Sequence, residues 1–385
     1  MRDQPRRRRS TAAVAAAAAA LELELQDAAP DAPSAMTRVT PRRGGAVLYA
    51  LALALALTSA GCGGGGGGDG GGRSGSGPAG SGQRTRSPSA GSTAVRAPPS
   101  PLRLAYHPLY SLPAPLRDPA TAVLAGRRLV LLGGLDAADS SSAGIELADL
   151  RGILYTASLP LAQHDAQGAQ LGGIVYVFGG GSVSELDHII SFDPTRRVVH
   201  TVGTLPRAQS DVAVTASGAT AYVVGGYDGT NWLDTILAWR PGSAARVVAH
   251  LPVGLRYAAA STVDGKVLII GGSTPNGASD AVYRFDPASG RVRQIGRLPQ
   301  PITHAGAATL GSYVYLVGGR GETLDSQTAS IWSIDPLSGA VRLAGRLPQA
   351  LSDTGVLSIG GTLVVAGGLS PHGTETGVGE LVASR

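Results

Sequence analysis

The sequence has few aromatic residues and almost no cysteine, and both shortages limit what the protein can be. Aromatic residues make up 4% of the 385 positions, and Cys62 is the single cysteine, so no intramolecular disulfide can form. No basic stripe with interleaved aromatic residues is present, which leaves nucleic-acid binding without support. The 56 glycines and 25 prolines favour many turns and short strands over helices.

Charge is unevenly placed along the chain. The formal net charge is +5, but residues 1–100 hold 12 arginines and only 6 acidic residues. Residues 101–385 hold 20 basic and 21 acidic residues, so this part is close to neutral. A hydrophobic fraction of 43% is sufficient for a sizeable core, and the length permits one large all-β domain or two ordinary domains.

Residues 36–61 have the features of an export signal. Three arginines within residues 38–43 precede an apolar segment of 12 residues at 46–57. That segment is too short for a bilayer-spanning helix, which needs about 20 residues, but it fits the apolar region of a signal peptide. Three small residues then precede Cys62, an arrangement that resembles a bacterial lipoprotein signal and implies a lipid on this cysteine. The alternative is an ordinary signal peptide followed by an incidental cysteine.

The chain on either side of this signal carries no pattern of a folded domain. We interpret residues 1–35 as an upstream extension, with translation starting at Met36. Residues 62–101 are rich in glycine, serine and proline and cannot bury enough apolar surface to fold, so we expect a flexible tether. A lipid on Cys62 would hold an exported domain on the extracytoplasmic side of a cell membrane.

Two markers recur six times in residues 102–385. The first is an apolar run that ends in Gly-Gly, and successive copies are 46, 46, 46, 47 and 49 residues apart. The first glycines are Gly133, Gly179, Gly225, Gly271, Gly318 and Gly367. The second marker is a Leu-Pro pair in phase with the first. A period in the forties with four short strands per repeat is typical of a β-propeller blade.

Each repeat is expected to contain an inner strand of small residues, an apolar second strand that ends in Gly-Gly, and two further strands. Paired glycines keep the end of the second strand free of Cβ atoms where sheets pack closely and the chain turns. The last repeat lacks a fourth strand, and residues 102–113 end in the same Leu-Pro pair. We therefore predict an all-β, six-bladed propeller over residues 102–385, closed by residues 102–113 in the last blade.

This repeat resembles the Kelch repeat, through motifs such as "YVVGG" and the strand endings "SFDP", "RFDP" and "SIDP". The resemblance covers residues 102–385 and implies a Kelch-type β-propeller. Kelch propellers include galactose oxidase and the exported sugar mutarotase N-acetylneuraminate epimerase. The oxidase cofactor requires a cysteine crosslinked to tyrosine, and residues 102–385 contain no cysteine, so no cofactor is expected.

Six positions, each six residues after the leucine of a Leu-Pro pair, are expected to meet at the mouth of the central channel. They form a polar, mostly acidic ring suited to a small polar molecule or a cation. Arg117 and Arg256 directly precede two of them. In the alternative interpretation, the aspartates only cap backbone N–H groups of a neighbouring blade. No metal site is expected, because ligands on different blades would have to approach within about 2–2.6 Å of one ion. The six positions are Asp118, Asp165, Asp211, Tyr257, His304 and Asp353.

A loop on the same face, "YDGTNWLD", groups Tyr227, Asp228, Asn231 and Trp232 as further candidates for ligand binding. Tryptophan on a polar loop can stack on a sugar ring or anchor a partner protein. Alternatively, Trp232 folds over the adjacent blade as local packing.

The function that these features favour is a monomeric, membrane-tethered, non-catalytic module that binds a protein or carbohydrate ligand. The alternative is a cofactor-independent sugar mutarotase or epimerase-like enzyme, in which Arg117, Arg256, His304 and the aspartates perform acid–base chemistry. The sequence contains no Ser-His-Asp order, phosphate-binding loop or metal-spacing motif, and this absence favours binding over catalysis.

Overall fold

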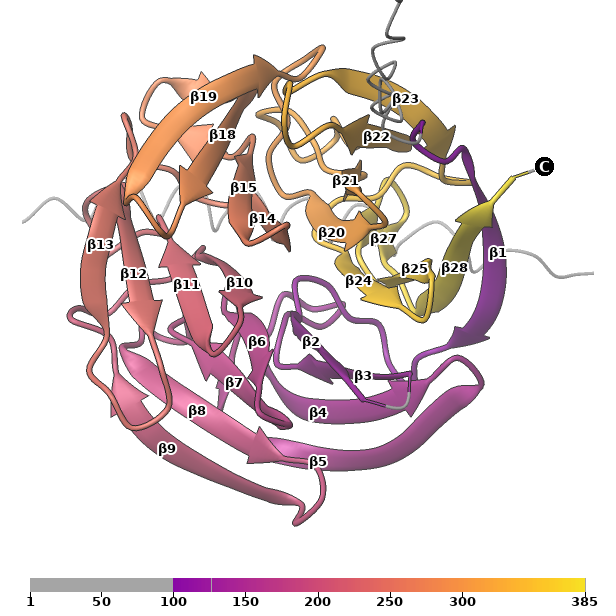
Figure 1. Ribbon diagram of the computed structural model, residues 1–385. Coiled ribbons are helices and arrows are strands. Elements are labelled where there is room, and N and C mark those ends of the chain that lie inside the picture. The colour runs from indigo at the N-terminus through magenta and orange to yellow at the C-terminus, as the bar shows by residue number, and fades with distance from the viewer. Residues whose placement is uncertain (1–99, 126, 385) are drawn as a thin grey trace, which may run out of the picture. The chain divides into compact units, whose positions relative to one another are not determined.

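The computed structural model describes residues 100–125 and 127–384, and these residues form an all-β propeller. Figure 1 shows the strands arranged around a central axis, with β2, β6, β10, β14, β20 and β24 innermost. The compact unit that contains them spans Gly91–Arg385. The predicted upstream extension, the signal peptide with Cys62, and nearly all of the tether lie outside the described residues. Among the described residues, no helix has the length and apolar character needed to cross a membrane.

Four separate sheets contain four antiparallel strands each. The first two are made of β2 (Ala120–Leu124), β3 (Arg128–Leu132), β4 (Ser142–Asp149) and β5 (Gly152–Gln163), and of β6 (Gln167–Leu171), β7 (Ile174–Phe178), β8 (His188–Asp193) and β9 (Val198–Thr204). The next two are made of β10 (Ala213–Ser217), β11 (Thr220–Val224), β12 (Thr235–Trp239) and β13 (Arg246–His250), and of β14 (Ala259–Val263), β15 (Lys266–Ile270), β18 (Ala281–Asp286) and β19 (Arg291–Arg297).

The remaining large sheet has eight strands and consists of two such runs of four. One run is β20 (Gly306–Leu310), β21 (Tyr313–Val317), β22 (Ser330–Ile334) and β23 (Val341–Arg346). The other is β24 (Gly355–Ile359), β25 (Thr362–Ala366), β28 (Gly377–Ala383) and β1 (Leu104–Ser111). A single parallel pair, Leu104 with Gly345, joins the two runs. Two short hairpins complete the described strands: β16 (Ser273–Thr274) with β17 (Gly277–Ala278), and β26 (Leu369–Ser370) with β27 (Gly373–Thr374).

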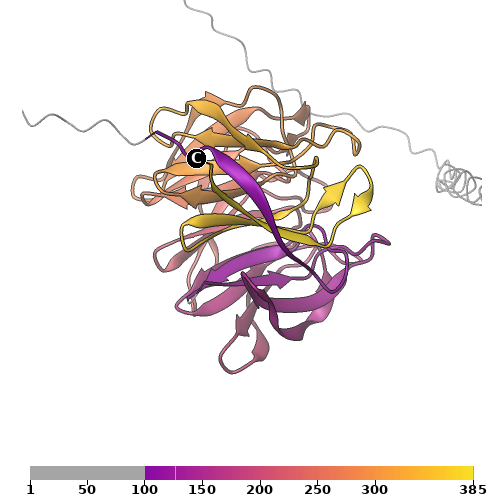
Figure 2. The ribbon, with the colours of Figure 1, turned by 90° about the vertical axis from the view of Figure 1, so that its right-hand side faces the viewer.

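The ring is closed between its two ends, as the sequence predicted. Strand β1 pairs antiparallel with β28 from Leu104 opposite Ala383 to Ser111 opposite Gly377, and Figure 2 shows these two strands side by side. Gly379 makes room for Tyr106, because a Cβ atom at Gly379 would lie 2.3 Å from that ring. The closing strand and its partner both belong to the described residues, so the ring is complete within the unit Gly91–Arg385.

The Gly-Gly pairs form identical corners after the second strand of each run. At Gly225 the backbone has φ +62°, and a Cβ atom there would lie 2.3 Å from the Leu255 carbonyl oxygen. The N–H of Gly226 donates a hydrogen bond to that same carbonyl at 2.7 Å. The other five pairs make the same contact, so the expected need for glycine at a close approach is confirmed.

The core lies between neighbouring runs, because each apolar second strand is covered on both sides. Every residue of β11 is buried, and Trp239 of the adjacent strand packs edge-on against Tyr176 and Phe178 of the preceding run. One boundary differs from the expected pattern: β5 continues past Leu159 and Pro160 to Gln163. Proline is tolerated there because β5 is the outer strand of its sheet and needs no further ladder donor.

The strand directions give the propeller two faces. We call the one formed by the hairpins between strands one and two and between strands three and four of each run the turn face. The opposite one, the mouth face, carries the entries to the inner strands and the loops after the Gly-Gly pairs. These two kinds of segment pair with each other, as in the bridges Ser210 to Tyr227 and Thr303 to Arg320. The described chain starts beside Leu104, on the turn face.

Candidate functional site

The six predicted positions form a hydrogen-bonded ring around the channel mouth, and we call them the mouth positions. Each has a left-handed backbone, with φ between 50° and 58°. Five donate their N–H to the carbonyl of the neighbouring mouth position at 2.6–3.1 Å, as Tyr257 does to Asp211. The sixth N–H, that of Asp165, donates to the Asp118 carboxylate at 3.0 Å.

This backbone geometry explains why aspartate is frequent at these positions. Aspartate tolerates a left-handed backbone better than most residues with a Cβ atom. The contact between Asp165 and Asp118 is the capping of a neighbouring N–H that the alternative interpretation predicted, and it occurs at one of the six positions. Tyr257 and His304 hold the same backbone despite their bulk. A role of the six side chains in ligand binding stays a prediction.

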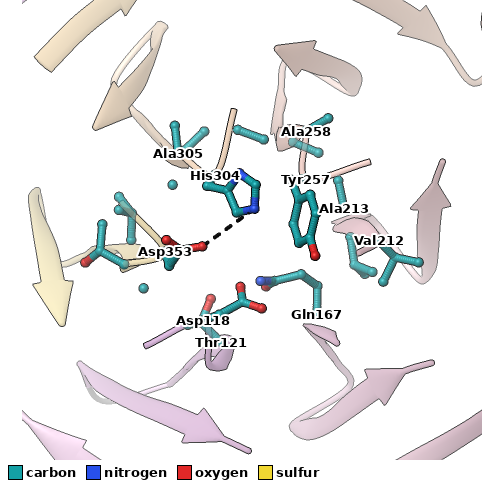
Figure 3. A pocket seen from close by; sticks show the side chains of 18 of the residues that line it. Asp118, Thr121, Gln167, Val212, Ala213, Tyr257, Ala258, His304, Ala305 and Asp353 are labelled. Carbon is teal, nitrogen blue, oxygen red and sulfur yellow. Dashed lines mark ion pairs between the residues drawn. The ribbon is translucent and has the colours of Figure 1, made fainter. Parts of the chain in front are cut away.

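The channel behind the mouth is narrow. It encloses about 100 Å³ and is lined by small residues of the inner strands as well as by the mouth positions. In Figure 3, the side chains of Asp118, Gln167, Tyr257, His304 and Asp353 point into the central space. Pockets for small molecules usually measure about 300–1,000 Å³, so the channel itself is too small to enclose a ligand of that kind.

Arg256 connects the ring to the predicted loop site. Its Nε donates to the Asp211 carboxylate, whose side chain is 1% exposed. The guanidinium lies 4.1 Å from the ring centre of Tyr227, 5.3 Å from that of Trp232 and 5.2 Å from that of Tyr257. Three aromatic rings and one carboxylate therefore hold this cation in place.

The four loop candidates divide into two pairs. Tyr227 and Trp232 contact Arg256, and the backbone of Trp232 lies close to Gly254. Asp228 accepts hydrogen bonds from the backbone N–H groups of Thr230 and Asn231. It also pairs with Arg207 at 2.6 Å. Asp228 and Asn231 thus shape the loop instead of meeting the ring.

His304 is held as a neutral imidazole. Its ring stacks on Tyr257 at 3.7 Å, and Arg320 donates to its Nε2 at 2.9 Å. Because Nε2 accepts, Nδ1 carries the proton and donates to the Thr303 hydroxyl at 3.0 Å. Burial, followed by the charges of Arg320, Arg256 and Arg117, lowers the pKa of His304 well below its usual value. A carboxylate oxygen of Asp353 lies 3.9 Å from the same Nε2 atom (Figure 3).

Burial changes the charge of the predicted acidic ring. It raises the pKa of Asp118 well above the usual value, helped by the hydrogen bond and the charge of Asp165. Burial and the charge of Asp165 raise the pKa of Asp211 to about 7, against the opposing effect of Arg256. The pKa of Asp353 is raised by burial as well. Carboxyls that resist ionisation carry less negative charge, so the mouth is less acidic than the sequence suggests.

Three arginines offset the charge that remains. Arg117 reaches out to Asp139 at 2.9 Å, and Arg320 lies 4.0 Å from Asp353. With Arg256, both influence the pKa of His304, so all three act on the same small region. Arg320 was not among the predicted site residues. The signal for it was its position directly after Gly319, which brings it opposite Thr303 on the mouth face.

The described residues contain no group of three or more histidine, aspartate or glutamate side chains able to hold a metal ion. The known proteins with related sequences include several Kelch-like proteins. Residues 254–299 match the Kelch motif. The chain is 31% identical to mouse Kelch-like protein 35 over 158 residues, which is 40% of this chain and 27% of that protein. It is 26% identical to Kelch-like protein 25 of Xenopus tropicalis over 238 residues, 57% of this chain and 40% of that protein.

The fold has a solved counterpart. A structure described as "Structure of YjhT" superimposes with a TM-score of 0.61 and 16% sequence identity, over 71% of this chain and 96% of that one. At this identity the likeness concerns the fold, and it defines a β-propeller. The chain is therefore a β-propeller in which residues 254–299 carry the Kelch motif. The chain spans between about a quarter and two fifths of the Kelch-like relatives that it matches.

Proposed function

We propose that the protein is a six-bladed Kelch propeller that binds a ligand on its mouth face and is tethered to a membrane by a lipid on Cys62. Kelch propellers generally serve as binding modules. The blade count rests on the six runs of four strands, and the tether rests on the signal-like residues 36–61 before Cys62. The mouth face offers a rigid ring of hydrogen-bonded backbone on which side chains of different kinds can be presented.

The class of ligand is inferred from one observation, the fixed orientation of the Arg256 guanidinium. Its Nε is used by Asp211, and aromatic rings hold its plane, so its orientation is fixed before a ligand arrives. The remaining N–H groups of a fixed guanidinium suit a carboxylate, which accepts two hydrogen bonds at once. Arg117 and Arg320 add positive charge nearby. We therefore expect a polar ligand that carries a carboxylate, presented by a sugar or by a partner protein.

Matched acids and amides test this proposal. Binding of glucuronate and glucuronamide, and of N-acetylglutamate and N-acetylglutamine, is measured by calorimetry on residues 91–385. We expect at least one acid to bind at least about tenfold more tightly than its amide, because a buried charged hydrogen bond contributes about 1.5–3 kcal/mol.

A pair of variants assigns that binding to the mouth. Asp211→Asn keeps a hydrogen-bond acceptor for Arg256 and should retain binding, whereas adding Arg256→Gln to it should abolish binding without leaving a buried charge unpaired. Arg346→Gln, at the end of an outer strand, is the control. If neither acid binds, or if binding survives the double variant, the mouth proposal is wrong. The tether is tested separately by cell fractionation, in which Cys62→Ala should release the protein from membranes.

A further inference from the structure

Every fourth strand begins with an exposed arginine on the turn face. In each case the arginine lies within one residue of the first residue of the strand, directly after the hairpin from strand three or, for β1, at the start of the described chain. We call these six residues the arginine rim: Arg103, Arg151, Arg197, Arg246, Arg291 and Arg342.

The hairpins do not require these arginines, although Arg197 also stacks on the Tyr155 ring at 4.4 Å. The hairpins are shaped by aspartates that accept backbone N–H groups, as Asp149 accepts from Arg151 at 2.7 Å and Asp335 from Leu337 at 2.8 Å. Any residue supplies such an N–H. Charged side chains on an outer strand discourage pairing with another sheet, but a charge anywhere along the strand would do this. Six arginines at the same end of six strands therefore need another explanation.

Exposed apolar side chains stand beside the rim. Leu102, Val198 and Val247 are direct neighbours of rim arginines, and all three are exposed. Leu337, at the tip of the hairpin before β23, is 74% exposed. Arginine next to an exposed apolar side chain is the composition of a surface that rests at the boundary between lipid headgroups and acyl chains.

A pocket opens on the turn face between two neighbouring runs. It measures about 420 Å³ and is lined by four cationic side chains, those of Lys266, Arg284, Arg291 and Arg293, together with Leu337. Arg284 is fixed by a hydrogen bond to the Pro336 carbonyl at 3.0 Å. Asp286 pairs with Lys266 at 2.7 Å, and Asp264 also lines the pocket, so the three arginines exceed the remaining acidic side chain and leave the pocket with an excess of positive charge.

The chain reaches the propeller on this same face. Arg103 belongs to the rim, and its carbonyl accepts the N–H of Ser384 at 2.9 Å, so both ends of the ring lie there. A flexible tether from Cys62 to residue 101 would therefore be joined to the propeller on the turn face, although it would not by itself fix the orientation of the propeller.

We propose that the arginine rim binds the surface of an anionic phospholipid membrane and turns the mouth face away from it. Only the argument about the tether rests on the proposed function, because the rim can meet lipid without a lipid on Cys62. The occupant is a lipid surface instead of a nucleic acid because exposed apolar side chains lie among the cations. Each arginine held near an anionic surface strengthens binding by about fivefold, and salt weakens it.

Vesicle sedimentation tests the rim with residues 91–385, which contain the complete ring and lack Cys62. Vesicles of phosphatidylcholine with and without phosphatidylglycerol are compared at low and high salt. We expect binding only with phosphatidylglycerol, and loss of that binding at high salt. The variant Arg291→Gln with Arg342→Gln should weaken binding by roughly tenfold or more.

The matched control removes two arginines from the other end of the same two strands. Arg297→Gln with Arg346→Gln gives the same net charge but leaves the rim intact, and should bind vesicles like the wild type. The proposal is overturned if phosphatidylglycerol brings no binding, if both double variants lose binding equally, or if the rim binds a single-stranded oligonucleotide but not vesicles. None of these results depends on Cys62, so the proposal of a lipid tether and the proposal for the arginine rim can be disproved independently of each other.

Discussion

The mouth face and the turn face lie at opposite ends of the same strands, and aspartates at the mouth positions differ in pKa from aspartates in the turn-face hairpins. On the mouth face, burial raises the pKa of Asp118, Asp211 and Asp353. On the turn face, a backbone hydrogen bond from Arg196 lowers the pKa of Asp193, and a hydrogen bond from Lys266 lowers that of Asp286 to about 2.

This difference in pKa separates aspartates that stabilise the hairpins from aspartates whose charged form is destabilised by burial. Turn-face aspartates such as Asp149 and Asp193 accept backbone N–H groups and shape the hairpins beside the arginine rim. Asp118, Asp211 and Asp353 lie in a ring where burial disfavours their ionisation, and groups with perturbed pKa values concentrate at functional sites. The comparison also covers glycine, because the corner glycines of the mouth face meet backbone atoms while several turn-face glycines meet open space.

The largest expected effect removes the strand that connects the two faces. Deleting residues 102–113 takes away β1, which leaves β28 and β23 with unpaired edges and opens the ring. We expect the cooperative thermal transition of residues 91–385 to disappear, and calorimetry measures this. A deletion variant that melts at the wild-type temperature would show that closure does not depend on this strand.

A smaller effect compares one glycine from each face. Gly225 and Gly218 have φ +62° and +59°, but a Cβ atom at Gly225 would clash with the Leu255 carbonyl, whereas Gly218 has nothing within 4 Å. Gly218→Ala should cost about 1 kcal/mol for the left-handed backbone alone. Gly225→Ala should cost about 3 kcal/mol or more, because the corner must also move. Urea unfolding measures both, and equal losses would contradict the role assigned to the corner.

The smallest expected effect is a pH dependence confined to the mouth face. The native pKa of Asp211, about 7, exceeds the unfolded value of about 3.9, so the native state binds more protons between these limits. The contribution of Asp211 to wild-type stability should therefore fall as pH rises from about 4 to 7, and Asp211→Asn should become more stable relative to the wild type, by on the order of 2 kcal/mol. Urea unfolding at several pH values measures this difference.

Two features of this pH experiment keep it specific. His304 stays neutral when folded, so its contribution is lost as pH falls below its unfolded pKa, and comparing two proteins that both contain it cancels this effect. Asp193→Asn is the turn-face control. Since the pKa of Asp193 is lowered, its contribution is lost only in acid, and the difference from wild type should stay flat from pH 5 upward. A flat difference for Asp211→Asn as well would remove the contrast between the faces.

Much of the fold could be predicted because it repeats. The six Gly-Gly pairs and the Leu-Pro markers predicted four strands in each repeat. The Leu-Pro pair that ends at Pro113 comes before the first complete repeat, and it indicated the closing strand. The short hairpins β16–β17 and β26–β27 were not predicted, because two-residue strands leave no periodic signal.

The site was less predictable because its properties arise from contacts between runs. The spacing of the repeats predicted that Asp211 and His304 belong to one ring. It did not predict the left-handed backbone of Tyr257 and His304, because these residue types rarely adopt it. The contact of Arg320 with His304 depends on the pairing of two loops. The raised pKa of Asp211 depends on burial, and burial cannot be deduced from the number of acidic and basic residues in the sequence.

The central claim is that the turn face meets a membrane while the mouth face stays free, and fluorescence on single cysteines tests it most directly. Residues 91–385 contain no native cysteine, so Leu337→Cys on the turn face and Val183→Cys on the mouth face each carry one label. On vesicles with phosphatidylglycerol, we predict that a polarity-sensitive dye shifts to the blue and is quenched by nitroxide lipids at position 337. The dye at position 183 should keep its spectrum in water. Equal responses at the two positions, or a stronger response at position 183, would contradict the account.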